Sequence, residues 1–336
     1  MNEMTERRRF FQTSAVPVRY NNLTGTITVA YEIYGQLNSA KDNAILIVHG
    51  FSADSHVAAH DAADRKGWWE WAVGPGRPLD TDRYYIVCAN NLGSCFGSSG
   101  PTTVSPVTGQ TLGPSFPYPT MEDIVFCQME LQQHLGVSCW QAVIGGSLGG
   151  MAALQWMSAF PSRVTTAICL NAGIRLSHMG RGLMDIQADM LRLGGAGGLH
   201  LARRLATLSF VHEEYFRRRQ QAEGDWQLTS WLAEEAHDFA CRFDPLSYAG
   251  FLHAMTAFEC HPSQGVQGRR VIIVGSEEDI LFPPSLLRET ADRFAPFAYV
   301  TLRILSSPCG HDAFLLDEEQ YAPILREIFG PGSGAV

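Results

Sequence analysis

One serine in the sequence stands between two pairs of glycines. Ser147 follows a short apolar run at 142–144 and precedes a stretch of small residues, in the order VIGGSLGGMAAL. Gly145, Ser147 and Gly149 match the pattern G-x-S-x-G, which places a nucleophilic serine on a sharp turn between a strand and a helix. A bare match also occurs in tight turns that do no chemistry. The strand before Ser147 and the helix after it favour a nucleophile that forms a covalent intermediate.

A serine hydroxyl is a weak nucleophile and needs a general base beside it. Where a serine occupies such a turn, an acidic residue and then a histidine follow it along the chain. Asp279 comes just after a predicted strand in VIIVGSEEDILFPP, and His311 comes after the last predicted strand in LRILSSPCGHDAF. Glu277 and Glu278 compete with Asp279, and we interpret them as solvated side chains. The sequence therefore predicts a catalytic triad of Ser147, His311 and Asp279.

Acyl transfer also needs backbone N–H groups that bind the negative oxygen of the tetrahedral intermediate. The residue after the nucleophile, Leu148, supplies one such group, and the loop after an early strand supplies another. The stretch ILIVHGFSADSH has this arrangement, so we expect the second donor to be the N–H of Phe51. The alternative is that this stretch is an ordinary turn at the end of a strand.

The elements that position these residues are short apolar runs separated by helical patterns. Near-continuous apolar runs are typical of parallel strands that are buried on both faces. Such runs occur at residues 45–48, 85–88, 142–144, 166–170, 271–274 and 300–305. Helical patterns occupy 121–135 and 151–160, and residues 26–34 alternate as an antiparallel edge strand does. This order predicts the α/β class, with a mainly parallel central sheet flanked by helices.

Two regions interrupt the alternation of strands and helices. Residues 91–119 are rich in Gly, Ser, Thr and Pro and predict a long loop, which in a compact domain is usually functional or disordered. Residues 175–255 contain helical patterns and no convincing strand. We therefore expect a core made of residues 1–174 and 256–336, with residues 175–255 inserted between two strands as a helical lid.

The composition limits the class of partner. The net charge of the 336 residues is −9, which argues against binding to nucleic acid. The arginines near the amino terminus are not followed by a secretory signal, and no apolar run is long enough to span a membrane. The eight cysteines form no C-x-x-C pair and no zinc-spaced cluster, so we expect no metal, mostly buried thiols and a cytoplasmic location. No P-loop or Rossmann glycine loop is present, and we expect no resident cofactor.

Several stretches resemble the homoserine O-acetyltransferase family of the α/β hydrolases. They are VIGGSLGGMAALQWMSAFPSRV, LFPPSLLRETAD, GHDAFLL and GWWEWAVGPGRPLDTDRYYIVCANNLGSCFGSSGP, the last of which is specific to that family. The resemblance covers residues 20–175 and 240–325. It implies the α/β-hydrolase fold and a triad that takes an acyl group from acetyl-CoA or succinyl-CoA onto Ser147 and passes it to an amino-acid hydroxyl. It also implies a homodimer formed through the lid.

The resemblance implies two residues that bind the amino-acid acceptor. The stretch GGLHLARRLATLSF is similar to the family's lid helix, whose arginine holds the substrate carboxylate, and this arginine corresponds to Arg203. Asp312, directly after the predicted catalytic histidine, corresponds to the acid that pairs with the substrate ammonium. The alternatives are that Arg203 is a surface arginine and that Asp312 only orients its loop.

The sequence also departs from the family pattern in the lid. The stretch MGRGLMDIQADMLRLGGAGG lacks the family's Asn-Glu-Val-x-Arg helix and the long loop after it, and Ala152 replaces a usual Gln after Met151. A transferase must exclude water from the acyl-enzyme, and a shorter lid excludes it less well.

These departures lead us to rank three functions. The sequence places first a hydrolase of short-chain acyl esters, namely acetate esters of small alcohols, as in homoserine-transacetylase-like esterases of the ethyl acetate type. The alternative is a homoserine or serine O-acetyltransferase that uses acetyl-CoA as co-substrate. A third hypothesis is a catalytically inactive binding module that kept the fold, and an intact triad argues against it.

Overall fold

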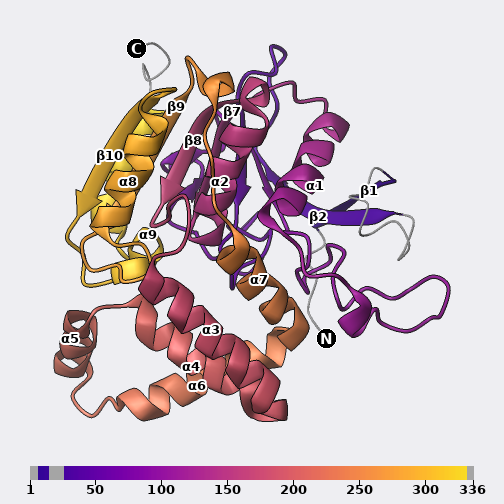
Figure 1. Ribbon diagram of the computed structural model, residues 1–336. Helices are drawn as coiled ribbons and strands as arrows, with labels where there is room; N and C mark the ends of the chain where they lie inside the picture. Colours follow the sequence, from indigo (N-terminus) through magenta and orange to yellow (C-terminus); the bar gives the residue numbers. More distant parts are fainter. Residues whose placement is uncertain (1–6, 15–25, 331–336) are drawn as a thin grey trace.

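The computed structural model describes residues 7–14 and 26–330. Its centre is an eight-stranded sheet with the order β1-β2-β6-β3-β7-β8-β9-β10 (Figure 1). The strands are β1 (Arg9–Thr13), β2 (Ile27–Tyr34), β3 (Ala44–Val48), β6 (Tyr85–Ala89), β7 (Trp140–Gly146), β8 (Val164–Leu170), β9 (Arg270–Ser276) and β10 (Tyr299–Leu305). Two short strands, β4 (Val73–Gly74) and β5 (Leu79–Asp80), pair with each other outside this sheet.

The sheet is parallel from β6 to β10 and antiparallel at one edge. β2 runs antiparallel to both β1 and β6, whereas every other neighbouring pair is parallel. All residues of β3 and β6 are buried, as expected for strands covered on both faces. The predicted α/β class with a mainly parallel central sheet flanked by helices is thereby confirmed.

The antiparallel edge differs from the prediction by one strand. Residues 26–34 do form an antiparallel strand, but β1 lies outside it and forms the edge of the sheet. β1 leaves little signal in the sequence, because its residues, RFFQT, contain only two apolar side chains and four of the five residues are at least partly exposed. A strand with one exposed side lacks the continuous apolar run that marks the buried strands.

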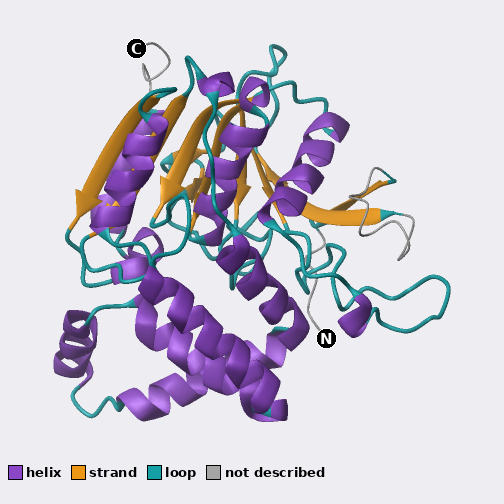
Figure 2. Cartoon of the chain, in the orientation of Figure 1, coloured by secondary structure: helices purple, strands orange, loops and turns teal. Residues whose placement is uncertain are grey.

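Helices cover both faces of the sheet, and Figure 2 shows those on the near face. α1 (Met121–His134), α2 (Leu148–Ala159) and α8 (Pro284–Phe294) pack into one buried cluster with one face of the strands, and α10 (Glu318–Phe329) packs into a second cluster on the opposite face. Thr120 caps α1 in a capping box with Asp123, which satisfies backbone groups at the helix start. The two clusters fix the strand ends that carry the predicted site residues.

Five helices separate β8 from β9. They are α3 (His178–Leu193), α4 (Gly198–Phe210), α5 (Glu213–Glu223), α6 (Leu228–Arg242) and α7 (Pro245–Ala257). Figure 1 shows α3, α4 and α6 gathered beyond the carboxyl ends of the parallel strands, which is where ligands bind in open α/β sheets. The division into a core and a lid at residues 175–255 stays a prediction, although the helices occupy that part of the chain.

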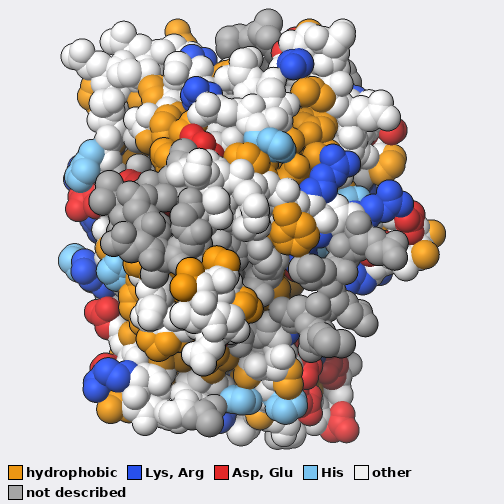
Figure 3. Space-filling view, turned by 90° about the vertical axis from the view of Figure 1, so that its right-hand side faces the viewer, with side chains coloured by type: hydrophobic (Ala, Val, Ile, Leu, Met, Phe, Trp, Pro, Cys, Tyr) orange, Lys and Arg blue, Asp and Glu red, His pale blue; other side chains and the backbone are white. Residues whose placement is uncertain are grey.

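Three further features bear on the sequence predictions. Residues 91–119 are mostly loop, with one short 3₁₀ helix at Gly113–Ser115. Within the described residues, no helix combines the length and apolar character that crossing a membrane requires. The eight cysteines are free thiols, and fewer are buried than expected, because Cys241 is exposed and three others are partly exposed. On the face drawn in Figure 3, hydrophobic, basic and acidic side chains are intermixed.

Candidate active site

Ser147 occupies the turn between β7 and α2 with a strained backbone. Its φ of 55° lies in the left-handed region, which a residue with a side chain rarely adopts. The flanking glycines permit this turn because it passes close to β3. A Cβ on Gly149 would lie 2.0 Å from the carbonyl oxygen of Val48, and one on Gly145 would lie 2.4 Å from the backbone of Gly149. The Ser147 N–H donates to the carbonyl of Leu170 over 3.0 Å, which holds the turn against β8.

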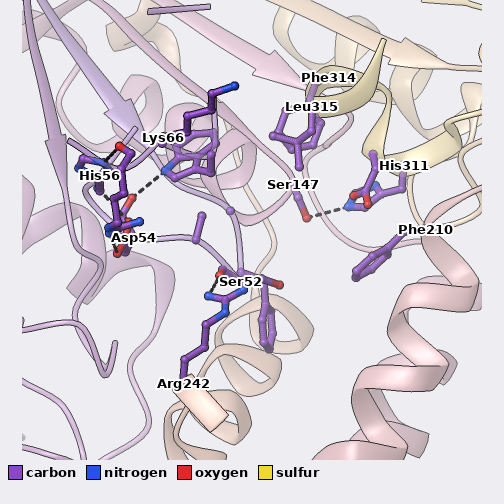
Figure 4. Close-up of a pocket in the computed structure, with 17 residues that line it drawn as sticks. Ser52, Asp54, His56, Lys66, Ser147, Phe210, Arg242, His311, Phe314 and Leu315 are labelled. Atoms are coloured by element: carbon purple, nitrogen blue, oxygen red, sulfur yellow. Dashed lines mark hydrogen bonds and ion pairs between the residues drawn. The ribbon is translucent and has the colours of Figure 1, made fainter. Parts of the chain in front are cut away.

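The structure brings the three predicted triad residues together, and Figure 4 shows the contact between Ser147 and His311. The hydroxyl oxygen of Ser147 lies 2.8 Å from Nε2 of His311, and Nδ1 of His311 lies 2.9 Å from Oδ2 of Asp279. Because an ionised carboxylate only accepts, Nδ1 of the imidazole carries its proton and Nε2 accepts from the serine hydroxyl. In this arrangement the histidine can take the serine proton, as a general base does.

Asp279 is buried and held in place by backbone donors. Its Oδ1 accepts from the N–H groups of Leu281 and Phe282, at 2.8 and 3.0 Å. Its predicted competitors behave differently. Glu277 is exposed, as expected, but Glu278 is not merely solvated, because its carboxylate accepts from Ser276, Ser306 and Ser307 and braces the loop.

Two supporting residues escaped the sequence analysis. The Asn171 side chain donates to Oδ2 of Asp279 over 3.3 Å and to the carbonyl of Gly310 over 3.0 Å. The hydroxyl of Tyr321, from α10, donates to Oδ1 of Asn171 over 2.5 Å. Asn171 also has a φ of 44°, a left-handed backbone conformation directly after a strand. This conformation marks the residue as unusual, but it is visible in the structure and not in the sequence.

The electrostatics of His311 suit a general base. Burial alone would lower its pKa, but the charge and hydrogen bond of Asp279, together with the charge of Asp312, outweigh burial and raise the pKa above its ordinary value of 6.5. The carboxylate of Asp279 thus stabilises the imidazolium that forms when Ser147 loses its proton.

The two predicted oxyanion donors flank the serine. Leu148 is the first residue of α2, so its N–H has no carbonyl within the helix to donate to. Phe51 lies in the loop after β3 and lines the pocket with Ser147. The rings of Tyr248 and Phe251 hold the Phe51 ring edge-on, at centroid distances of 4.5 and 5.5 Å. The roles of Leu148 and Phe51 in binding an oxyanion stay predictions.

Two adjoining cavities meet at Ser147. The larger, of about 400 Å³, is bordered by Ser147 and His311 on one side and by Ser52, Asp54 and Arg242 on the other (Figure 4). The smaller, of about 20 Å³, lies among apolar side chains of the helices between β8 and β9 and of the core. The larger cavity has room for a small-molecule substrate.

Arg203 and Asp312 lie in these adjoining cavities. Asp312 lines the larger one, and Arg203 lines the smaller one together with Ser147. Among the described residues, neither side chain has an ion-pair partner within 4.0 Å. Nη1 of Arg203 donates to the hydroxyl of Ser52 over 3.0 Å, while its Nε is buried without a partner. Burial raises the pKa of Asp312, and the nearby charges of His311 and Arg203 only partly offset this.

The family model that describes the alpha/beta hydrolase fold matches residues 43–318. A protein named homoserine O-acetyltransferase, from Symbiobacterium thermophilum, is 37% identical over an alignment that covers 90% of this chain and 89% of that protein.

Two solved structures extend the comparison. Esterase E22 superposes with a TM-score of 0.85 at 26% identity, over 96% of this chain and 99% of that chain. The homoserine O-acetyltransferase of Bacillus anthracis superposes with a TM-score of 0.84 at 22% identity, over 98% of this chain and 99% of that chain. At this identity the likeness shows a shared fold.

Proposed function

The chain belongs to the homoserine O-acetyltransferase family of the α/β hydrolases, and from this membership we propose that it transfers an acetyl group from acetyl-CoA to the hydroxyl of homoserine or serine. The sequence placed ester hydrolysis first and this transfer second. The curated relatives support the transferase better, since the relative from Symbiobacterium thermophilum carries that name at 37% identity along most of both chains.

One observation carries the proposal. The guanidinium of Arg203 and the carboxylate of Asp312, neither of which has an ion-pair partner among the described residues, lie in the two cavities that meet at Ser147. An α-amino acid carries a carboxylate and an ammonium, which complement these two charges. A simple ester offers neither charge, so an enzyme that acts only on such esters has no use for this pair. The pair therefore favours a zwitterionic acceptor.

The first half of the reaction acylates the serine. The Ser147 oxygen attacks the thioester carbonyl while Nε2 of His311 takes the hydroxyl proton, and Asp279 stabilises the resulting imidazolium. The N–H groups of Phe51 and Leu148 bind the oxyanion of the tetrahedral intermediate. The carbon–sulfur bond then breaks, His311 returns the proton to the departing thiolate, and the acetyl group remains on Ser147.

The second half transfers the acetyl group. The hydroxyl of the amino acid, held by Arg203 and Asp312, gives its proton to His311 and attacks the acyl-enzyme carbonyl. The bond from the acetyl carbon to the Ser147 oxygen breaks, and His311 protonates that oxygen. Serine is regenerated and the O-acetyl amino acid leaves, with no net change in protons.

The test supplies purified protein with acetyl-CoA, with and without homoserine or serine. We expect free CoA to appear only when the amino acid is present, together with O-acetyl amino acid detected by mass spectrometry. Release of acetate and CoA at a rate that the amino acid does not change would contradict the transferase proposal. A Ser147→Ala variant controls for uncatalysed thioester hydrolysis.

Substitution of Arg203 tests how the acceptor is bound. We expect Arg203→Met to raise the KM for the amino acid about tenfold to hundredfold, because a charge-assisted hydrogen bond is lost. Hydrolysis of nitrophenyl acetate, which has no carboxylate, should fall by a smaller factor, because it loses only the contact of Arg203 with Ser52. Arg204→Met is the matched control, since Arg204 is the next residue of α4 and lines neither cavity. Equal effects of the two variants would refute the assigned role.

Hydrolysis of short acetate esters is the second candidate function. It is favoured by the superposition on esterase E22, at 26% identity and a TM-score of 0.85. The departures in the lid sequence point the same way, because poorer exclusion of water favours hydrolysis of the acyl-enzyme. Acetate release from ethyl acetate, without any O-acetyl amino acid formed from acetyl-CoA, would select this function.

A further inference from the structure

A buried carboxylate on β2 lies behind one wall of the larger cavity. The Glu32 side chain is fully buried, and each of its oxygens accepts from several donors. The donors are Arg8 Nε (3.1 Å) and Ser55 Oγ (2.9 Å) on Oε1, and Tyr34 OH (3.2 Å), His56 Nδ1 (2.9 Å) and His60 Nε2 (3.0 Å) on Oε2. Burial alone would raise the pKa of Glu32, but these hydrogen bonds and the charge of Arg8 hold it far below its usual value. Glu32 is therefore ionised.

The ring of His56 lies between two groups that only accept hydrogen bonds. Nδ1 faces the Glu32 carboxylate at 2.9 Å, and Nε2 faces the backbone carbonyl of Arg65 at 2.8 Å. Neither a carbonyl nor an ionised carboxylate has a proton to donate, so both ring nitrogens must carry one. Burial lowers the pKa of His56, but these two contacts outweigh it and raise the pKa above 6.5. The geometry thus makes this ring an imidazolium.

His49, seven residues earlier and also buried, has the opposite environment. Its Nε2 accepts from the backbone N–H of Asn91 over 3.0 Å, so that nitrogen has no proton. Its Nδ1 lies 2.7 Å from the carbonyl of Gly50 and carries the single proton of a neutral ring. Burial lowers the pKa of His49 to about 4. Two buried histidines of the same loop therefore differ in protonation, and the difference comes from their hydrogen-bond partners. The acceptors on both sides of His56 favour its protonated ring.

The charges around His56 balance when the ring is protonated. Within residues 7–14 and 26–330, three cations and three carboxylates lie together: Arg8, Arg65 and His56 with Glu32, Asp54 and Asp64. Asp54 accepts from Arg8 at 3.1 Å and from Arg65 at 3.2 Å, and Asp64 lies 4.0 Å from Nε2 of His56. A neutral ring would leave the group with a net negative charge around the fully buried carboxylate of Glu32, which is costly.

A divalent cation at this place would use Glu32, His56 and His60, whose ligand atoms lie within 4.8 Å of one another. Two observations disfavour it. The guanidinium of Arg8 contacts the same carboxylate and would repel a cation. The distances of 2.9 and 3.0 Å from Glu32 to the two rings are those of direct hydrogen bonds. We therefore treat a metal as an outcome that the experiment must exclude.

The cluster fastens the part of the chain that carries an oxyanion donor. Residues 51–56, here called the oxyanion segment, line the larger cavity through Phe51, Ser52, Ala53, Asp54 and His56. The segment is tied to β2 at its far end, where Ser55 and His56 both donate to Glu32. His56 also ties it to the next turn of the loop through the carbonyl of Arg65.

We propose that His56 is a positioning residue for acyl transfer: as an imidazolium held between Glu32 and Arg65, it fixes the oxyanion segment and thereby the N–H of Phe51. This proposal rests on the proposed function only in that Ser147 is the residue acylated, and it does not depend on the acceptor. His56 lines the larger cavity, but both its ring nitrogens are bound by Glu32 and by the carbonyl of Arg65, so neither is free to act on a substrate. Its effect reaches the reaction through the position of the oxyanion segment, and a small displacement of a catalytic group is costly in rate.

The first test compares variants by the rate at which nitrophenyl acetate acylates Ser147 in a single turnover. We expect His56→Leu, which loses both contacts, to lower this rate about tenfold to hundredfold. His56→Asn keeps an amide donor toward Glu32 and should recover part of the loss. His60→Leu is the matched control, because it removes a donor from the same Glu32 oxygen but lies outside the oxyanion segment. Rates are measured well below the Tm of each variant, so that a lower stability alone does not change them.

The second test asks for the protonation state directly. In histidine-labelled protein at pH 8, we expect an NMR signal with protons on both ring nitrogens that is absent from His56→Asn. The acylation rate of the wild type should fall at alkaline pH, where His56 loses a proton and one of its contacts, and His56→Asn should lack this fall.

Other charged and titratable groups face His56, and the variant separates them from it. They are Arg8 before β1, Glu32 and Tyr34 on β2, Cys88 on β6, and Asp54, His60, Asp64 and Arg65 in the loop after β3. Burial raises the pKa of Tyr34 and of Cys88, so both stay neutral through the alkaline range. An alkaline fall that persists in His56→Asn would belong to one of the remaining groups.

Three results would overturn the proposal. They are equal acylation rates for His56→Leu and His60→Leu, a neutral His56 ring at pH 8, and a stoichiometric metal ion that His56→Asn loses. Failure of the proposed function looks different. If the wild type is never acylated on Ser147, the triad assignment fails, while the NMR measurement still decides the state of His56.

Discussion

At the scale of single residues, Ser147 combines a reactive position with a strained backbone. Its φ of 55° costs about 1–3 kcal/mol in a residue with a side chain, and the surrounding contacts must supply that energy. We therefore expect Ser147→Gly to abolish acylation and yet to be more stable than Ser147→Ala. Relief of the backbone strain stabilises the glycine variant, and the greater flexibility of glycine in the unfolded chain offsets part of this gain, which leaves a difference of about 0.5–2 kcal/mol in the free energy of unfolding. Urea unfolding of the two variants measures this difference.

The comparison with Ser147→Ala isolates the backbone because both variants lose the hydroxyl and its hydrogen bond to His311. A second pair, Ser306→Gly and Ser306→Ala, gives the ordinary ranking at a position whose φ is not in the left-handed region. There glycine should be the less stable variant. If Ser147→Gly ranked below Ser147→Ala as well, the turn would not store the strain that we assign to it.

The pH dependence of acylation follows from the residues around His311. The reaction needs the neutral imidazole, and the pKa of His311 is raised, so the rate is low at acidic pH and rises as the pH passes through a pKa above 6.5, before the alkaline fall expected from His56. The charge of Asp312 contributes to this raised pKa. Removing that charge in Asp312→Asn lowers the pKa of His311, and the rising limb of the profile should move to lower pH.

The profile is measured with nitrophenyl acetate, because this substrate has no ammonium for Asp312 to bind. Glu318→Gln provides the control, since it removes an exposed negative charge a few residues further along the chain. We expect its profile to match that of the wild type. A shift of the rising limb to higher pH in Asp312→Asn would be inconsistent with the electrostatic account.

At the scale of elements, the buried strands and the elbow could be predicted because each leaves a local pattern. β3 and β6 are continuous apolar runs. The glycines around Ser147 are needed because the turn lies so close to the backbone of Val48 that a Cβ would not fit. β1 could not be predicted this way, because an edge strand needs apolar side chains on one face only. The chain order of the triad was predictable, but the contacts of Glu32 were not.

The unpredicted supports of the site join parts of the chain that are distant in sequence. Asn171 contacts Asp279 across 108 positions, and Tyr321 contacts Asn171 across 150. No spacing rule links such residues, because the sheet order and the packing of α10 decide which of them meet. A single asparagine after a strand is also compatible with an ordinary turn. Only the assembled fold distinguishes the two interpretations.

Tyr321 shows how α10 supports the triad from behind. Its hydroxyl donates to Asn171, which in turn donates to Asp279. We expect Tyr321→Phe to lower the free energy of unfolding by about 1–3 kcal/mol, because it leaves a buried acceptor on Asn171 without its donor. Tyr299→Phe serves as the control, since that side chain is 72% exposed. Equal values in urea unfolding for the two variants would contradict the assigned support.

At the scale of the whole molecule, an apolar stripe lies on the outside of α3. Met179, Ile186 and Leu193 are spaced by seven residues and are 63%, 49% and 73% exposed. Seven residues are close to two helical turns, so these side chains share one face. The opposite face of α3 packs inward through Met184 and Gln187. Exposed apolar side chains in such a row mark a surface suited to protein contact.

The occupant that we propose for this stripe is a second copy of the chain, which agrees with the homodimer that the family resemblance implies. A twofold interface is self-complementary, so one stripe on α3 can pack against the same stripe of the partner. We expect the wild type to sediment as a dimer at micromolar concentration and the double variant Met179→Asp, Ile186→Asp to sediment as a monomer. Val107→Asp is the control, because Val107 is 87% exposed but lies in the loop before α1. A wild type that is monomeric, or a double variant that stays dimeric, would rule out this stripe as the dimer contact.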